Sequence, residues 1–233
     1  MGSATADNDM AFELDHLFIC TEPDAPAAEQ LLQFGLVEGR ANVHAGQGTA
    51  NRCFFFHNLM LELLWVHNAA EAQSDVTRPT YLWARWAGRS QNACPFGVCL
   101  RPIEGQVHEA LPFPTWNYQP AYFPGGVAIP VATNVSVLSE PMLFYLPFAK
   151  RQDSYPEAKA QPLDHAFGGR EVTRVSLTLT QPPPRSAELE AIAATNLIAI
   201  QTGPAYLMEL GFDGETQAQH HDFRPALPLI VHW

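Results

Sequence analysis

The 233-residue sequence is short of basic residues. It has 13 lysines and arginines against 24 aspartates and glutamates, so its formal net charge is -11. Nucleic acids and anionic membrane surfaces attract positive charge, so this balance argues against both as partners. We therefore expect the partners to be small molecules or other proteins.

Cysteine is also scarce, and long apolar runs are missing. Cys20, Cys53, Cys94 and Cys99 are too few for a disulfide scaffold, and their spacing matches no zinc motif. The polar, acidic N-terminal stretch has no apolar signal-peptide core, and no segment is long enough to cross a bilayer. We therefore expect reduced, structural cysteines and a cytoplasmic protein.

Sequence signatures of several common enzyme classes are absent. There is no GxSxG nucleophile elbow, no HExxH helix and no GxGxxG dinucleotide fingerprint. The GxxxxGK pattern of a phosphate loop is missing too, although residues 46–48 read Gly-Gln-Gly. The sequence therefore gives no support to a serine hydrolase, a zincin protease or a nucleotide-binding enzyme.

Two short apolar segments each carry one ionisable side chain. Residues 14–19 and 60–66 both have the composition of strands, with His16 in the first and Glu62 in the second. Alternate side chains share a face of a strand, so we expect His16 to lie on one face with Leu14 and Phe18. Burying such a group is costly unless it is paired or bound to a metal. We therefore expect the two side chains to meet in a pocket.

The expected elements divide the chain into consecutive segments. Residues 59–63 and 206–210 are similar and each hold one glutamate, which indicates an internal repeat. The predicted divisions are a flexible tail at 1–11, a βαβββ module at 12–68, a helical connector at 69–92, a second strand-rich module at 93–150, a polar connector at 151–171, and a βαββ extension or repeat at 172–233.

Several motifs resemble the vicinal oxygen chelate superfamily, which includes the glyoxalase and bleomycin-resistance proteins. Within it, the chain is most similar to the bacterial glyoxalase-like domain proteins. The motifs are Asp-His-Leu-Phe at 15–18, His-Ala-Gly-Gln-Gly-Thr-Ala-Asn-Arg at 44–52 followed by three phenylalanines, Leu-Glu-Leu at 61–63, and Pro-Phe-Gly-Val-Cys-Leu-Arg at 95–101.

The resemblance implies an α+β fold in which paired βαβββ modules form an open, half-barrel mixed sheet flanked by helices. The cleft of such proteins often holds one divalent metal, here expected to be zinc, iron, manganese or nickel, or else no cofactor. By position, His16, Glu62 and Glu209 are the metal candidates, and the two glutamates are also the catalytic candidates. The second module offers Val98 and Tyr145, which are not usual ligands, so the sequence does not show a four-ligand set.

Other polar and aromatic residues are candidates for binding a substrate. The glycine loop can be either a pocket wall or a plain hairpin connection, and the aromatic segment around 113–123 either a pocket wall or a stiff loop over the core. The substrate-binding candidates are His44, Thr49, Asn51, Arg52, Arg101, Trp116 and Tyr118.

The leading functional prediction is a glyoxalase-like protein that binds a small organic molecule in a concave sheet. As an enzyme it would be a metal-dependent lyase, isomerase or ring-cleaving dioxygenase. The alternative is a non-catalytic, resistance-type protein that sequesters its ligand without a metal. A third reading is an interaction module whose sheet edge pairs with a second copy, and we expect a homodimer as the assembly. In the plainest reading, His16 and Glu62 form only a buried hydrogen bond.

Overall fold

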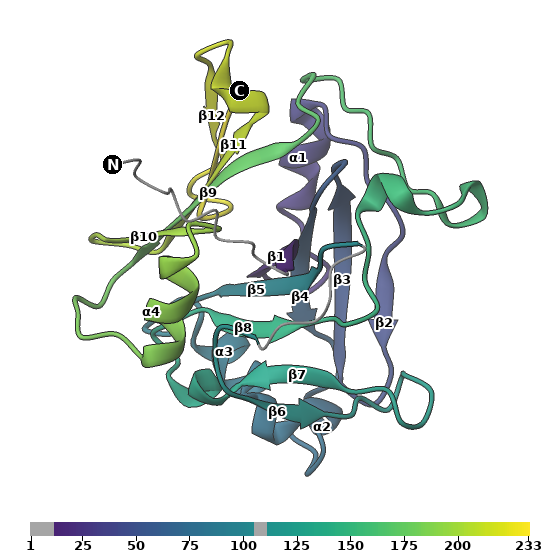
Figure 1. The fold of residues 1–233 in the computed structure, drawn as a ribbon, viewed down its shortest axis with the longest axis vertical. Coiled ribbons are helices and arrows are strands. Elements are labelled where there is room, and N and C mark those ends of the chain that lie inside the picture. The colour runs from purple at the N-terminus through teal and green to yellow at the C-terminus, as the bar shows by residue number, and fades with distance from the viewer. Residues whose placement is uncertain (1–11, 105–110) are drawn as a thin grey trace, which may run out of the picture.

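The computed structural model describes residues 12–104 and 111–233 (Figure 1). The tail expected at 1–11 therefore lies outside the described residues. Eight strands form one large mixed sheet in the order β2-β3-β4-β1-β5-β8-β7-β6. They are β1 (Phe12–Cys20), β2 (Asn42–His44), β3 (Thr49–Phe55), β4 (Met60–Val66), β5 (Phe96–Pro102), β6 (Thr115–Tyr118), β7 (Ile129–Ala132) and β8 (Met142–Tyr145).

The large sheet consists of two halves that meet at its centre. Strands β1 and β5 pair antiparallel there, while β1 pairs parallel with β4, and β5 pairs parallel with β8. The two outermost strands, β2 and β6, do not pair with each other, so the sheet stays open. The predicted α+β class with an open mixed sheet is confirmed.

The two halves differ in their helices. Helix α1 (Ala28–Phe34) follows β1 and ends at Gly35, whose φ of 107° lets its backbone N–H reach the carbonyls of Leu31 and Leu32. No helix is described between β5 and β6, where residues 105–110 lie outside the described ranges. The connector between the halves carries α2 (Ala69–Ala72) and α3 (Leu82–Gly88). None of the described helices is both long and apolar enough to span a bilayer.

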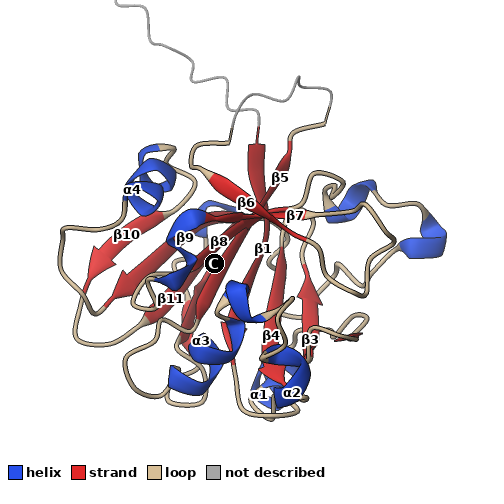
Figure 2. Ribbon diagram, turned by 90° about the horizontal axis from the view of Figure 1, so that it is seen from below, coloured by secondary structure: helices blue, strands red, loops and turns tan. Residues whose placement is uncertain are grey.

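The C-terminal part forms a second, smaller sheet. Its strands are β9 (Val172–Leu179), β10 (Ala199–Thr202), β11 (Leu207–Phe212), β12 (His220–Asp222) and β13 (Leu229–His232), in the order β10-β9-β11-β13-β12. Helix α4 (Ala187–Ala194) lies beside β10 in both views (Figures 1 and 2). Its N-cap is Ser186, whose hydroxyl accepts a hydrogen bond from the backbone N–H of Leu189.

The two similar glutamate segments occupy different places in their sheets. Glu62 lies on β4, which closes the first module and runs parallel to β1. Glu209 lies on β11, which runs antiparallel to β9 and pairs in parallel with β13. The strand pairing therefore does not make Glu209 the counterpart of Glu62.

Strand β1 separates two apolar clusters. Leu17 and Ile19 point into the larger cluster, where they pack with residues of the smaller sheet such as Leu177 and Leu210. Phe18, between them in the sequence, belongs to the other cluster on the opposite face of the large sheet. One face of β1 therefore supports the C-terminal sheet, and the other is available for a site.

Candidate functional site

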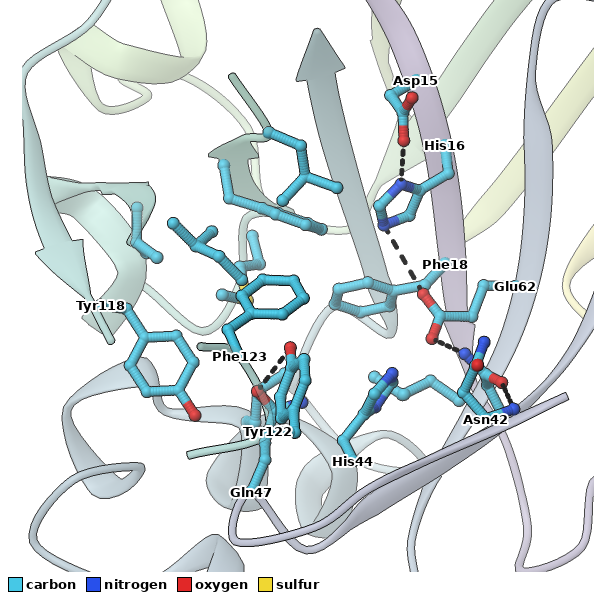
Figure 3. A pocket seen from close by; sticks show the side chains of 18 of the residues that line it. Asp15, His16, Phe18, Asn42, His44, Gln47, Glu62, Tyr118, Tyr122 and Phe123 are labelled. Atoms are coloured by element: carbon cyan, nitrogen blue, oxygen red, sulfur yellow. Dashed lines mark hydrogen bonds and ion pairs between the residues drawn. The ribbon is translucent and has the colours of Figure 1, made fainter. Parts of the chain in front are cut away.

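A cavity of about 470 Å³ opens on the face of the large sheet that points away from the smaller sheet. Figure 3 shows its wall from close by. The first half of the sheet supplies most of the polar groups, and α3, β7, β8 and the segment before β7 supply most of the apolar ones. The lining residues are Asp15, His16, Phe18, Asn42, Val43, His44, Gln47, Asn51, Met60, Glu62, Leu64, Leu82, Tyr118, Tyr122, Phe123, Ile129, Val131, Met142, Phe144 and Leu146.

A β-bulge in β1 shapes the polar end of the cavity. Leu14 pairs with Leu100 and His16 pairs with Cys99, so Asp15 is an extra residue on β1. Leu14 packs against the cluster shared with the smaller sheet, whereas Asp15 and His16 both line the cavity. The expectation that Leu14 shares a face with His16 is therefore wrong, because the bulge interrupts the alternation of side chains.

Three buried ionisable groups lie in a row at this end. His16 Nδ1 lies 2.6 Å from Asp15 Oδ2, and its other nitrogen, Nε2, lies 3.7 Å from Glu62 Oε2 (Figure 3). The first distance is a hydrogen bond, and the second is an ion-pair distance too long for one. The sequence-based expectation of a His16–Glu62 encounter thus extends to an Asp15–His16–Glu62 row.

Two neighbours hold the outer members of this row. Asn51 Nδ2 donates to Glu62 Oε1 at 2.6 Å. Arg101 is fully buried behind Asp15, with Nη1 3.5 Å from Asp15 Oδ1 and Nε 3.0 Å from Glu13 Oε1. These contacts fix the carboxylates and partly compensate their burial.

The pKa values of the two cavity histidines are shifted in opposite directions. Burial lowers the pKa of His16, but the hydrogen bond to Asp15 and the charges of Asp15 and Glu62 outweigh burial, so the pKa is raised above its ordinary value. Burial lowers the pKa of His44, which therefore stays neutral near pH 7. His44 Nδ1 lies 2.9 Å from the Thr49 hydroxyl, and its ring packs on Tyr122 at 4.9 Å. Of these two histidines, only His16 has surroundings that favour its protonated form.

Apolar side chains line much of the rest of the cavity. The ring of Phe144 meets His16 edge to face at 5.2 Å, and Phe18 lies 6.1 Å from Phe144. Met142 and Val131 from β8 and β7 continue this wall. A molecule that fills the cavity therefore touches both the buried ionisable row and a largely apolar wall.

Five of the residues expected to form the site line the cavity. They are His16, Glu62, His44, Asn51 and Tyr118. Two others lie just behind its wall, because Thr49 contacts His44 and Arg101 contacts Asp15.

Three of the expected residues lie elsewhere in the structure. Arg52 is held by Glu38 and Glu29, with N–O distances of 2.6 and 2.9 Å, and does not line the cavity. Trp116 lies on β6 outside the cavity lining. Glu209 lies on the smaller sheet, where its Oε1 is 3.1 Å from His232 Nε2. The structure therefore separates these three from His16 and Glu62.

Sequence reasoning missed several residues of the site. Asp15 was noted only as part of a motif, because its place depends on a bulge formed against β5. Gln47, from the glycine loop, also lines the cavity and lies 3.5 Å, measured at Oε1, from the hydroxyl of Tyr122, which belongs to the aromatic segment that the sequence offered as a pocket wall. Phe144, next to the Tyr145 considered from the sequence, lines the cavity from β8, as does Met142. In the sequence, the aromatic content of the 113–123 segment indicated that this segment could form a pocket wall.

The donor atoms fit a resident metal poorly. His16 Nε2 and Glu62 Oε2 are close enough to share an ion, but three-ligand catalytic sites need another donor on the same side. Among the described residues, the one cluster of three potential donors is Asp15, His16 and Cys99. Burial holds the pKa of Cys99 well above its ordinary value, and Asp15 occupies the far nitrogen of His16. The described residues of this cavity therefore do not form the usual three-donor metal site.

Comparison with known proteins gives distant structural likenesses only. A hypothetical protein from Staphylococcus aureus has a TM-score of 0.49 at 11% identity, covering 95% of this chain and 99% of its own. A xylose isomerase-like TIM barrel/4-hydroxyphenylpyruvate dioxygenase fusion protein has a TM-score of 0.44 at 9% identity, covering 86% of this chain and 36% of its own. No family model and no curated protein sequence matches the chain. At these values neither likeness assigns a family or a function, although the mixed sheet is compatible with a glyoxalase-like fold.

Proposed function

We propose that this chain is a divergent glyoxalase-like protein that binds a small organic molecule in the cavity of its large sheet. The strand order supports this class, because two halves that each pair a first and a last strand in parallel meet at their first strands. The motifs at 15–18 and 61–63 that suggested the class both contribute to the cavity wall.

One observation carries the proposal: the buried Asp15–His16–Glu62 row opens into a cavity whose far wall is apolar. Its volume of about 470 Å³ lies within the range of small-molecule sites. Buried ionisable groups cost stability, and structural packing alone would favour apolar side chains here. Binding of a ligand explains both the cost and the space.

The Asp15–His16 pair favours proton transfer as the reaction at this site. Asp15 orients the imidazole and raises its pKa, while Nε2 points toward Glu62 (Figure 3). A histidine in this setting gives or takes a proton at Nε2, and Glu62 accepts one on the same side. A lyase or isomerase step that moves one proton on the ligand needs these two groups. A sequestering protein would use the same cavity without turnover.

A neutral aromatic probe tests the binding proposal. We expect 2-naphthylmethanol, titrated calorimetrically, to bind with a Kd below about 1 mM, as the usual binding energy per heavy atom predicts. Leu146 lines the cavity, so Leu146→Trp should weaken the binding at least about tenfold by filling space. The matched control is Val76→Trp, at an exposed site outside the cavity lining. Binding that Leu146→Trp leaves unchanged would contradict the proposal.

Turnover distinguishes the enzyme from the sequestering protein. A screen for small molecules that raise the melting temperature supplies candidate substrates, whose conversion is then followed by NMR. For a proton-transfer enzyme, His16→Gln should lower the rate by about 10²–10⁴ and change binding far less. If a converted compound is turned over equally by His16→Gln, the proton-transfer role is wrong. If tight ligands are not converted at all, the sequestering function stands.

A further inference from the structure

The cavity contains no basic residue with a permanent charge. Among the described residues, its lining includes the carboxylates Asp15 and Glu62 but neither lysine nor arginine. The stretches 1–11 and 105–110, outside the described ranges, contain no lysine or arginine in the sequence either. A carboxylate or phosphate on a ligand is normally met by such a group, so this cavity lacks the fixed cation that usually neutralises one.

The two basic side chains that contact these carboxylates, Arg101 and His16, are already engaged. Arg101 is not a lining residue but lies behind Asp15. It also contacts Glu13 and donates to the carbonyl of Asn58. His16 lies 2.6 Å from Asp15 but 3.7 Å from Glu62, so it interacts more strongly with Asp15 than with Glu62. Of the two cavity carboxylates, Glu62 is therefore the less compensated.

Glu62 also keeps an oxygen that can accept a new hydrogen bond. Its Oε1 accepts from Asn51, whereas the described contact of Oε2 is the 3.7 Å approach of His16. Both oxygens of a carboxylate accept hydrogen bonds, so Oε2 has capacity for a donor on the ligand. The donor that gains most from a buried carboxylate is a charged ammonium group.

Several aromatic rings line the same cavity as this carboxylate. Phe18, Phe144, Tyr118, Tyr122 and Phe123 all line the cavity. Ring faces attract cations, and rings also stack with a flat apolar ligand. A carboxylate at one end and several aromatic rings around it are the features that recognise an organic cation.

Resting on the proposed function, we propose that the ligand class of this cavity is an aromatic molecule bearing an amine. Its ammonium group hydrogen-bonds to Glu62, and its ring packs against Phe144 and the tyrosines. Molecules of the same size that carry a carboxylate or a phosphate are rejected, because their charge meets Glu62 and no fixed cation.

Three matched probes test this assignment on the unmodified chain. They are 2-naphthylmethylamine, 2-naphthylmethanol and 2-naphthoate, titrated calorimetrically at pH 7. We expect the amine to bind about 10–100-fold more tightly than the alcohol, the range that a charged hydrogen bond usually gives. The naphthoate should bind more weakly than the alcohol. Naphthoate binding as tight as that of the amine would overturn the assignment.

A pair of glutamate variants locates the preference. Glu62→Gln should weaken amine binding about 10–100-fold and leave alcohol binding within about threefold. Glu209→Gln is the matched control, because Glu209 has a similar local sequence but lies on the smaller sheet away from the cavity lining. Amine binding that Glu62→Gln leaves unchanged would also overturn the assignment. The comparison of the three probes on the unmodified chain does not depend on how the variants fold.

Failure of this inference is distinguishable from failure of the proposed function. If the probes bind and Leu146→Trp blocks them, but the carboxylate is preferred, the cavity is a ligand site and only the ligand class is wrong. If none of the three probes binds, or if Leu146→Trp changes nothing, the cavity is not a ligand site and both proposals fall.

Discussion

Asp15 and His16 are neighbours in the sequence, yet both side chains lie on the same side of β1, with 2.6 Å between Asp15 Oδ2 and His16 Nδ1. In a regular strand they would point to opposite faces. The bulge thus gives the imidazole a carboxylate partner from the adjacent residue. The neighbouring strand in the sheet, β4, supplies Glu62 on the other side of the imidazole ring.

This relationship predicts a change in the protonation of His16. Asp15→Asn should lower the pKa of His16, because it removes both the charged hydrogen-bond partner and its electrostatic attraction while burial remains. Titration of the imidazole signals by NMR measures the pKa directly. Glu62→Gln is the comparison and should lower the pKa less, since Glu62 acts only through its charge. An unchanged pKa in Asp15→Asn would show that the pair does not form.

His16 also makes the stability of the fold depend on pH. Its pKa is raised in the folded chain, so its contribution is fully present below the unfolded value of about 6.5 and is lost as the pH rises through the folded value. The measurement is the free energy of unfolding in urea from pH 5.5 to 9, for the unmodified chain and for His16→Gln. The difference between the two should fall as the pH rises. A difference that is flat, or that rises, contradicts the raised pKa.

Gly97 is expected to be intolerant of a side chain. It lies on β5 opposite Phe18, and an added Cβ would come within 2.0 Å of the Phe18 ring. Gly97→Ala should therefore push this ring toward the cavity and cost about 1–3 kcal/mol in the free energy of unfolding. Binding of 2-naphthylmethanol should weaken as well. Gly125→Ala is the control, because nothing lies within 4 Å of the position of its added Cβ.

The donor set predicts weak binding of divalent metals. Titration of the chain with Zn²⁺, Mn²⁺ or Ni²⁺ should give no tight one-to-one site, because no residue that the structure describes gives His16 and Glu62 a third donor on their side. Prolonged treatment with EDTA should leave the melting temperature unchanged. A stoichiometric metal that is lost in both His16→Gln and Glu62→Gln would overturn this prediction and restore the metal site expected from the sequence.

Much of the fold was predictable because it depends on local patterns. The apolar strand segments around His16 and Glu62 are short, bounded by turn residues and correctly spaced for neighbouring strands. Through the family resemblance, the motifs in these segments implied an α+β fold with an open mixed sheet, which the structure confirms. They did not indicate how the C-terminal strands pair, because Glu62 and Glu209 have similar neighbours but β4 and β11 pair differently with their partners.

The site was less predictable because its details come from contacts between distant segments. The bulge at Asp15 exists only against β5 and has no local signal in the sequence. Arg52 looked available to a ligand, but Glu38 and Glu29 hold its guanidinium group outside the cavity. Whether an arginine reaches a ligand depends on which acidic residues the fold brings near it, and one sequence does not state that.

The two ends of the cavity come from different halves of the large sheet. The ionisable row sits on β1 and β4, while β7 and β8 contribute Ile129, Val131 and Met142. Replacing those apolar side chains with larger or smaller ones therefore offers a way to retune which molecules fit while the proton-handling groups stay as they are. For a protein engineer, β7 and β8 are therefore the strands in which substitutions can change ligand selectivity without replacing an ionisable group.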